Sequence, residues 1–220
     1  MAHTVLVLGG TGQTGRRLIQ QALERGIDVH ALVRDPRRLA IASDRLTVVT
    51  GTPMEDGDVR AAMTGCSAVL STLGVSRTSP WPWAASTSPP GFMATSIANT
   101  IRSMADLGVA RIVVVSAGGV GDSAGDMPPL FRWLVDHSRI GEAYQGHEDQ
   151  ERLLRESAMD WTALRPSMLS NQPRSGEVVL SYRGQPRPRR SISRDTLAAA
   201  MLDALDDDSL IRKAPTISQA

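Results

Sequence analysis

Glycines and small polar residues near the N-terminus have a spacing that suits phosphate binding. Residues 9–15 read Gly-Gly-Thr-Gly-Gln-Thr-Gly and directly follow an apolar run. Gly9 and Gly10 permit a tight turn, and Gly12 lets the backbone approach a phosphate. Gly15 lets the following helix pack closely on the strand, with its free N–H groups facing a dinucleotide pyrophosphate. The expected phosphate-binding residues are therefore Gly9, Gly10, Thr11, Gly12, Gln13, Thr14 and Gly15.

A glycine spacing of this kind is weak evidence alone, because an ordinary strand-to-helix turn can produce it. Here it follows a strand pattern and precedes an amphipathic helix that carries Leu18, Ile19 and Ala22 on one face and ends at Gly26. This context favours a dinucleotide site over a plain turn.

Arginines after the second predicted strand select between two forms of the cofactor. An acidic residue there accepts hydrogen bonds from the ribose of NAD, whereas an arginine favours the 2′-phosphate of NADP. The strand ends in Arg34, Arg37 and Arg38 follow, and Arg16 begins the first helix. Asp35 comes one position late and is typical of a turn residue. We expect NADP(H), bound by Arg34 and Arg38; the alternative is that these arginines are solvated charges on a turn.

The elements that must position these residues alternate between strand and helix. Their strands are continuously apolar, which is typical of a parallel sheet covered on both faces by helices. The fold class is therefore α/β, a Rossmann-type doubly wound, mainly parallel sheet, with residues 1–220 forming a single NAD(P)-binding domain. Strands are expected over 4–9, 29–34, 46–50, 68–73, 111–115, 161–165, near 178–180 and near Thr216, and helices over 56–63, 93–107, 141–156 and after the N-cap Ser193.

Two proline-rich or glycine-rich segments interrupt this alternation. Residues 75–91 are too long and too rich in proline for an ordinary connection, and such loops are usually functional or disordered. Trp81, Trp83 and Phe92 form either an apolar lid over an aromatic ligand or a patch packed on the body or on a partner. Residues 118–129 are expected to form a second long loop.

Composition excludes several classes of function. The net charge is only +1, and the arginines near residue 190 alternate with prolines instead of aromatics, so no nucleic-acid partner is expected. No apolar stretch approaches the ~20 residues of a membrane span, so we expect no membrane partner and a cytoplasmic location. Cys66 is the only cysteine, which argues against a disulfide or a metal site, and a catalytic Cys66 is disfavoured. A monomer or small homo-oligomer is expected.

Motifs spread over most of the chain resemble those of one family. The chain resembles the atypical short-chain dehydrogenase/reductases with NmrA-like members, and most closely their NADPH-dependent flavin reductase, or biliverdin-IXβ reductase, group. The motifs are Gly10 to Gly15, Leu32-Val33-Arg34-Asp35, Gly74, Ser116-Ala117, His147, Leu154-Arg155-Glu156-Ser157, Asn171-Gln172-Pro173 and Ile192-Ser193.

The resemblance implies a reductase that holds NADPH along the carboxyl ends of the strands and passes a hydride to a planar acceptor. It places Leu73 and Gly74 among the cofactor contacts, and Ser116 at both nicotinamide and acceptor. It also implies that His147 bonds or protonates the acceptor. The alternatives are that Ser116 is an ordinary residue at a strand end and that His147 is a surface or capping residue. The acceptor site is expected to be formed by loops 75–91, 116–130 and 166–190.

This chain also departs from the family. Met168 stands where the family has a further histidine, which argues against the same tetrapyrrole substrate; with Trp81 and Trp83 it is assigned to the acceptor pocket. Ordinary members of the wider group pair a tyrosine with a lysine four residues later. Tyr144 is instead followed at that spacing by Glu148, which would raise the phenol pKa, and the sole lysine is Lys213.

Three functions fit these residues. The first is an NADPH-dependent reductase of a flavin, quinone or similar planar small molecule, with Ser116, His147 and Tyr144 as candidate catalytic residues. Tyr144 lies three residues before His147, hence on the same helix face, where it either lines the pocket or simply packs. The second is an NmrA-like regulatory protein that binds NADP without turnover. The third is an isomerase or cyclase that contains NADP.

Overall fold

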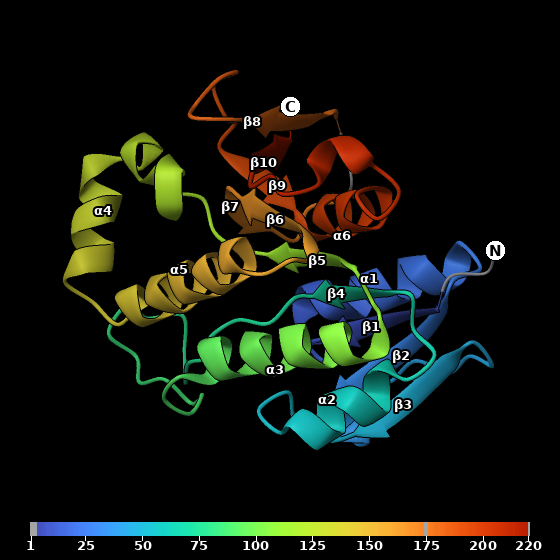
Figure 1. The fold of residues 1–220 in the computed structure, drawn as a ribbon. Coiled ribbons are helices and arrows are strands. Elements are labelled where there is room, and N and C mark those ends of the chain that lie inside the picture. Colours follow the sequence, from blue (N-terminus) through green and yellow to red (C-terminus); the bar gives the residue numbers. More distant parts are fainter. Residues whose placement is uncertain (1–3, 174–175, 220) are drawn as a thin grey trace.

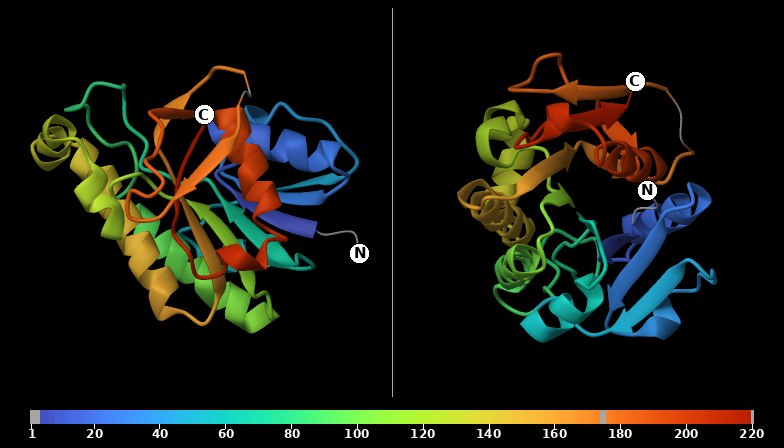
Figure 2. Two further views of the ribbon diagram at one scale, coloured as in Figure 1. Left: turned by 90° about the horizontal axis from the view of Figure 1, so that it is seen from above. Right: turned by 45° about the vertical axis from the view of Figure 1, so that its right-hand side comes forward.

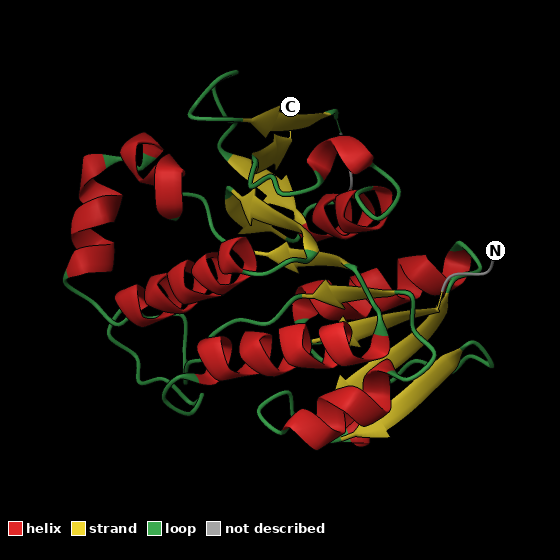
Figure 3. Cartoon of the chain, in the orientation of Figure 1, coloured by secondary structure: helices red, strands yellow, loops and turns green. Residues whose placement is uncertain are grey.

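A mainly parallel sheet forms the centre of the molecule. In the computed structural model, which describes residues 4–173 and 176–219, eight strands pair in the order β3-β2-β1-β4-β5-β6-β10-β8, and only β8 is antiparallel to its neighbour (Figures 1 and 3). This order confirms the predicted doubly wound Rossmann-type fold. The strands are β1 (Thr4–Leu8), β2 (Asp28–Val33), β3 (Leu46–Thr50), β4 (Ala68–Ser71), β5 (Arg111–Val115), β6 (Asp160–Pro166), β8 (Val178–Ser181) and β10 (Thr216–Gln219).

Helices cover both faces of this sheet, as Figure 2 shows. One layer holds α1 (Gln13–Glu24) and α6 (Arg194–Asp203), and the other holds α2 (Asp56–Met63), α3 (Phe92–Leu107) and α5 (Ile140–Glu156).

Alternate residues of one strand reach the two layers. In β1, Val5 and Val7 join the core under α1 and α6, whereas Leu6 and Leu8 join the core under α2, α3 and α5. Successive side chains of a strand point to opposite faces, which is why the strand is apolar throughout.

The segment between β5 and α5 differs from the expected loop. It contains a 3-10 helix, η2 (Gly121–Asp126), and an α-helix, α4 (Pro129–Asp136), so the prediction of a loop over 118–129 was wrong in part. A proline is well tolerated in the first turn of a helix, where its missing N–H has no partner to lose, and Pro129 begins α4 in this way. Val135 of α4 is buried, and the helix stands at the left of Figure 1, beyond the N-terminal end of α5.

Short elements complete the described chain. Strands β7 (Met168–Ser170) and β9 (Ser191–Ser193) pair as a small separate sheet that the sequence did not indicate, and η1 (Pro36–Arg38) and η3 (Asp208–Leu210) are single turns. The predicted N-cap is confirmed, because Ser193 Oγ accepts a hydrogen bond of 3.0 Å from the N–H of Thr196. Segment 75–91 carries one isolated bridge, between Arg77 and Ser86. No helix in the described ranges has the length and hydrophobicity needed to cross a membrane.

The parallel strands end at one edge of the sheet. The glycine turn follows β1, Arg34 follows β2, Leu73 and Gly74 follow β4, and Ser116 follows β5. In open sheets of this kind ligands bind outside these carboxyl ends, at the point where the strand order reverses, which here lies between β1 and β4. The fold therefore brings these sequence-predicted residues along a single edge.

Candidate cofactor and acceptor site

The glycine turn leaves little room for any side chain. Gly9 has a φ of +81°, and a Cβ on Gly15 would lie only 2.2 Å from the carbonyl oxygen of Gly9. At Gly10 a side chain is excluded by lack of space and not by the backbone angle. A Cβ at this position would lie 2.7 Å from Cδ1 of Ile19. Gly12 is the N-cap of α1, and no side chain caps the helix. The N–H groups of the first turn therefore lack side-chain partners and can bind a phosphate.

A cavity of about 480 Å³ opens beside Arg34, between the ends of β2 and β3. Asn99 of α3 donates hydrogen bonds of 3.2 and 2.8 Å to the carbonyls of Pro53 and Met54, and so fixes the loop after β3. The sequence reasoning did not identify this cavity, although its residues follow strand ends. Its lining is Arg34, Thr50, Gly51, Thr52, Met54, Glu55, Asp58, Pro89 and Phe92.

The arginines near this cavity differ in their partners. Arg34 lines the cavity and forms no side-chain hydrogen bond or ion pair with any described residue. Arg37 is turned back onto Asp35, with Nε 2.9 Å from Oδ1, and Arg16 donates to the carbonyl of Arg38. Asp35 also accepts from the N–H of Arg37, so its prediction as a turn residue is confirmed. Arg34 is therefore the guanidinium best placed for a ligand in the cavity.

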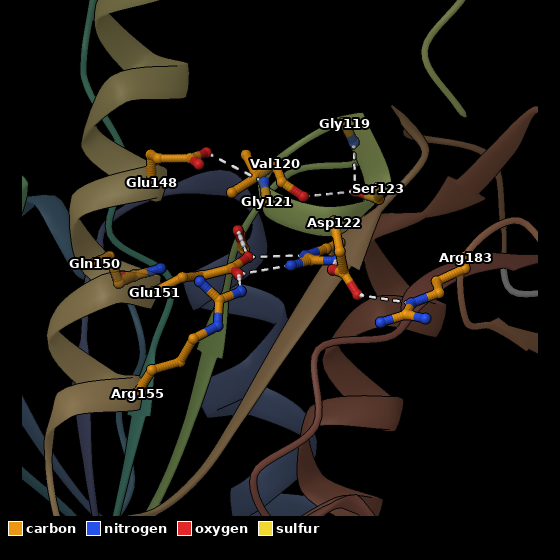
Figure 4. Close-up of polar contacts among 12 residues, drawn as sticks. Gly119, Val120, Gly121, Asp122, Ser123, Glu148, Gln150, Glu151, Arg155 and Arg183 are labelled. Carbon is orange, nitrogen blue, oxygen red and sulfur yellow. Dashed lines mark hydrogen bonds and ion pairs between the residues drawn. The ribbon is translucent and has the colours of Figure 1, made fainter. Parts of the chain in front are cut away.

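At the other end of the edge, Ser116 belongs to a buried ionic network around Glu151. Figure 4 shows Glu151 of this network with Asp122 and Arg155. The Oγ of Ser116 donates a 2.7 Å hydrogen bond to Oε1 of Glu151, and both residues are almost wholly buried. Arg165 clamps the same carboxylate through Nε at 2.8 Å and Nη2 at 2.7 Å, and donates to Asp122 through Nη1 at 2.6 Å. Arg155 supplies a further ion pair to Glu151. The network joins β5, β6, α5 and η2.

The charges of this network stabilise one another. Burial opposes the charge of Arg165, but its hydrogen bonds to Glu151 outweigh that effect and raise its pKa. Burial likewise opposes ionisation of Asp122, yet the bond to Arg165 lowers the pKa of this carboxyl. On the sequence alone, Glu151 lies four residues before Arg155, which is the spacing of an ordinary helical ion pair. The missed signal was Arg165, an arginine ending an apolar strand, because a buried guanidinium requires a buried anion.

Tyr144 and His147 lie on α5 and are both uncharged at neutral pH. The hydroxyl of Tyr144 donates to the carbonyl of Gly118 at 3.1 Å, and burial raises its pKa to about 12. The rise agrees with the sequence argument in direction, but its cause is burial and not Glu148, which instead accepts from the N–H of Gly121. Burial lowers the pKa of His147 to about 4, although Glu151 opposes the fall.

Two buried polar atoms at this end have no partner within the described ranges. They are Nδ1 of His147 and Oγ of Ser167, the residue after β6. Ser167 adjoins the β5 loop, because a Cβ on Gly118 would approach its Cα to 3.9 Å. Buried polar groups are normally hydrogen-bonded, so these atoms suit a polar ligand. With the uncapped glycine turn and the cavity beside Arg34, they fit an extended dinucleotide along the edge.

The residues assigned to an acceptor pocket are dispersed. Trp81 and Trp83 have ring centroids 5.4 Å apart, and Nε1 of Trp83 donates to the carbonyl of His137, between α4 and α5. Phe92 lines the cavity beside Arg34, and the lining of that cavity includes neither tryptophan. Met168 lies on β7 and is 62% exposed.

Two other reactive side chains lie away from the candidate site. Lys213 is exposed and forms an isolated β-bridge with Thr162. Thr162 lies three residues before Arg165 on β6, so this bridge is away from the edge where the strands end. Cys66 is buried, and burial raises the pKa of its thiol to about 12, which makes it a poor nucleophile.

Comparison with known proteins identifies the family. Residues 9–208 match the family model described as NAD(P)H-binding. The chain belongs to this NAD(P)H-binding family. The match begins at the first glycine of the turn, and it confirms the expected NAD(P)-binding domain.

Two related proteins align with most of this chain. An uncharacterised chloroplastic protein of Arabidopsis thaliana is 29% identical over 217 residues, covering 91% of this chain and 71% of that protein. A Bacillus subtilis protein named as an uncharacterised sugar epimerase is 25% identical over 222 residues, covering 96% and 91%.

Two solved structures share the fold of this NAD(P)H-binding protein. A short-chain dehydrogenase/reductase of Veillonella parvula in complex with NADP has a TM-score of 0.81 at 22% identity, covering 100% of this chain and 95% of that one. ChuY of Escherichia coli O157:H7, described as an anaerobillin reductase, has a TM-score of 0.78 at 19% identity, covering 98% and 97%.

Gly15→Ala tests the close approach in the glycine turn. The added methyl would meet the carbonyl oxygen of Gly9 at 2.2 Å. We therefore expect the free energy of unfolding to fall by about 1–3 kcal/mol, and most NADPH binding to be lost. Gly57→Ala in α2 is the matched control, because no atom lies within 4 Å of its Cβ, and it should leave both unchanged or slightly improved. Urea unfolding measures the stability, and fluorescence titration measures NADPH binding. Equal effects of Gly15→Ala and Gly57→Ala would contradict the crowding at Gly15.

The buried His147 predicts a pH dependence of stability. The unfolded chain takes up a proton near pH 6.5, whereas the folded chain takes it up only near pH 4. The contribution of the neutral imidazole is therefore complete above pH 6.5 and falls by about 1.4 kcal/mol per pH unit toward pH 4. Urea unfolding of the protein and of His147→Gln at several pH values measures this contribution. The difference in stability between the two proteins should change with pH. A constant difference would mean that the imidazole is not desolvated.

Proposed function

We propose that this protein is an NADPH-dependent reductase that passes a hydride to a planar, conjugated small molecule such as a flavin or quinone. One observation carries the proposal: the candidate catalytic side chains are all uncharged, and two have their protons engaged inside the protein. Tyr144 donates to Gly118, Ser116 donates to Glu151, and His147 stays neutral.

This arrangement disfavours chemistry that needs a proton relay. Reducing a simple carbonyl, or epimerising a sugar, requires a group that gives or takes a proton at an oxygen or carbon as the hydride moves. A phenol with a pKa of about 12 serves that purpose poorly without a neighbouring cation, and Lys213 lies away from Tyr144. A conjugated acceptor spreads the incoming charge over its rings and takes a proton later from water. Uncharged side chains are sufficient for such an acceptor.

The same residues suggest how each part of the cofactor is held. The glycine turn and the start of α1 would bind the pyrophosphate, and the cavity beside Arg34 would hold the adenosine half. The other half would then extend over β4 and β5 toward Ser167 and His147, whose unpartnered atoms can bond its polar groups. When bound, NADPH supplies the hydride, while the protein orients and encloses the reactants. The NADP complex of the Veillonella parvula structure supports the choice of phosphorylated cofactor.

Arg34→Glu tests the assignment of the 2′-phosphate. Removing the guanidinium and adding a carboxylate should weaken NADPH binding by about 100-fold or more, because a charge-assisted bond to phosphate is lost and a repulsion is gained. NADH, which lacks that phosphate, should bind with little change. Arg37→Glu is the matched control, since Arg37 is already paired with Asp35, and it should have a small effect. Equal weakening of both cofactors by Arg34→Glu would rule out the phosphate contact.

An acceptor survey with Tyr144→Phe tests the reaction. We expect free flavin or a quinone to stimulate NADPH oxidation, and Tyr144→Phe to lower that rate by less than about tenfold, below the effect of removing a general acid. Absorbance at the reduced nicotinamide band measures the rate. Tight NADPH binding without oxidation by any acceptor would favour a regulatory protein, and turnover of sugar nucleotides abolished by Tyr144→Phe would favour an epimerase.

A further inference from the structure

A patch of exposed apolar side chains lies outside the cofactor edge. We call Trp81, Trp83, Leu130, Trp133 and His137 the aromatic patch. Leu130, Trp133 and His137 are spaced at i, i+3 and i+7 and so share one face of α4 and the residue after it. The rings of Trp133 and His137 stack at 5.0 Å, Trp83 bonds the carbonyl of His137, and Trp81 lies against Trp83. The five residues are thus continuous although they come from two segments.

The exposed area of this patch is large for a monomer. Leu130 is 80% exposed, Trp81 65%, Trp133 51% and Trp83 46%. Because each of the three tryptophans carries about 150–250 Å² and Leu130 adds a largely exposed aliphatic side chain, these four leave on the order of 500 Å² of apolar surface in water. Patches beyond a few hundred Å² usually mark an interaction site. Two such patches pressed together would bury roughly 1,000 Å², which is about the minimum area expected of a biological interface.

Charged residues of both signs flank the aromatic patch. Arg77 lies at the end of the patch near Trp81, where its guanidinium bonds the carbonyl of that residue, and it is the only charged residue of segment 75–91. Asp126 precedes α4 at the end near Leu130. Neither Arg77 nor Asp126 forms an ion pair with the described residues. A two-fold axis through the patch would bring each Arg77 toward the partner's acidic end, as an isologous interface requires.

The rim disfavours a membrane as the partner. The segment from 117 to 148 contains no cluster of basic residues that would attract anionic headgroups. Tryptophan and arginine, by contrast, are enriched in the centres of protein interfaces. The charged residues of that segment are Asp122, Asp126, Arg132, Asp136, Arg139, Glu142 and Glu148.

We propose that the aromatic patch binds a second copy of this chain, forming a two-fold dimer in which α4 packs against α4 of the partner. The proposal is independent of the reaction, because none of its residues lies in the glycine turn, in the cavity beside Arg34 or in the Glu151 network. It selects the dimer from the range of monomer or small homo-oligomer that the sequence left open.

Sedimentation velocity of the full chain over a wide concentration range tests the dimer. The protein should sediment as a dimer, and Leu130→Asp or Trp133→Glu should raise the dissociation constant by about 30-fold or more, as expected for residues at an interface centre. Both side chains are exposed, so thermal unfolding should show that the variants remain folded. Val48→Glu is the matched control, because Val48 is 38% exposed on the distant strand β3, and it should leave the mass unchanged.

A charge exchange tests the two-fold register. Arg77→Asp and Asp126→Arg should each weaken the dimer, and the two together should restore it, because the exchanged charges again face opposite partners. A protein that stays monomeric at every concentration would overturn the proposal. So would a monomer that instead binds vesicles of phosphatidylcholine and phosphatidylserine, or single charge variants that the double variant does not rescue.

Discussion

The buried pair of Arg165 and Glu151 determines the shape of the candidate site where β5 and β6 end. Two charges removed from water are stable only when nearly all their hydrogen-bonding positions are filled, and removing one partner typically costs about 3–5 kcal/mol. Here both carboxylate oxygens of Glu151 accept from guanidinium groups, and one also accepts from Ser116. The pair fastens the end of β6 to α5 and, through Ser116 and Asp122, fixes the path of the chain after β5.

Features that depend on neighbouring residues were predictable from the sequence. The glycine turn, the parallel strands and the cap at Ser193 each follow from a few consecutive residues, because backbone freedom and strand burial are local properties. The arginine after β2 was identified for the same reason, since its place at the strand end fixes which edge it reaches. The residues proposed to hold the cofactor could therefore be identified largely from the sequence.

Features that depend on distant contacts were not predictable in this way. Glu151 reads as a surface residue of a charged helix until β6 brings Arg165 against it. Trp81, Trp83 and Phe92 stand close in sequence, yet their surroundings differ. Phe92 begins α3 and is buried, whereas Trp83 donates a hydrogen bond to a carbonyl after α4. The prolines before α4 suggested a loop, although one of them occupies a helix start. For Glu151 and Trp83 the deciding partner lies far along the chain.

The placement of α4 has a consequence for how such proteins diverge. Beyond Asp122, the segment that carries α4 lies outside every strand until α5 begins, so insertions or substitutions there do not change the register of any strand. Gly15, by contrast, has no space for a single methyl group. Selection can therefore remodel one region freely while it holds the other nearly constant. Descendants of one ancestral chain would retain a common nucleotide cradle and differ in the surfaces built on this insertion.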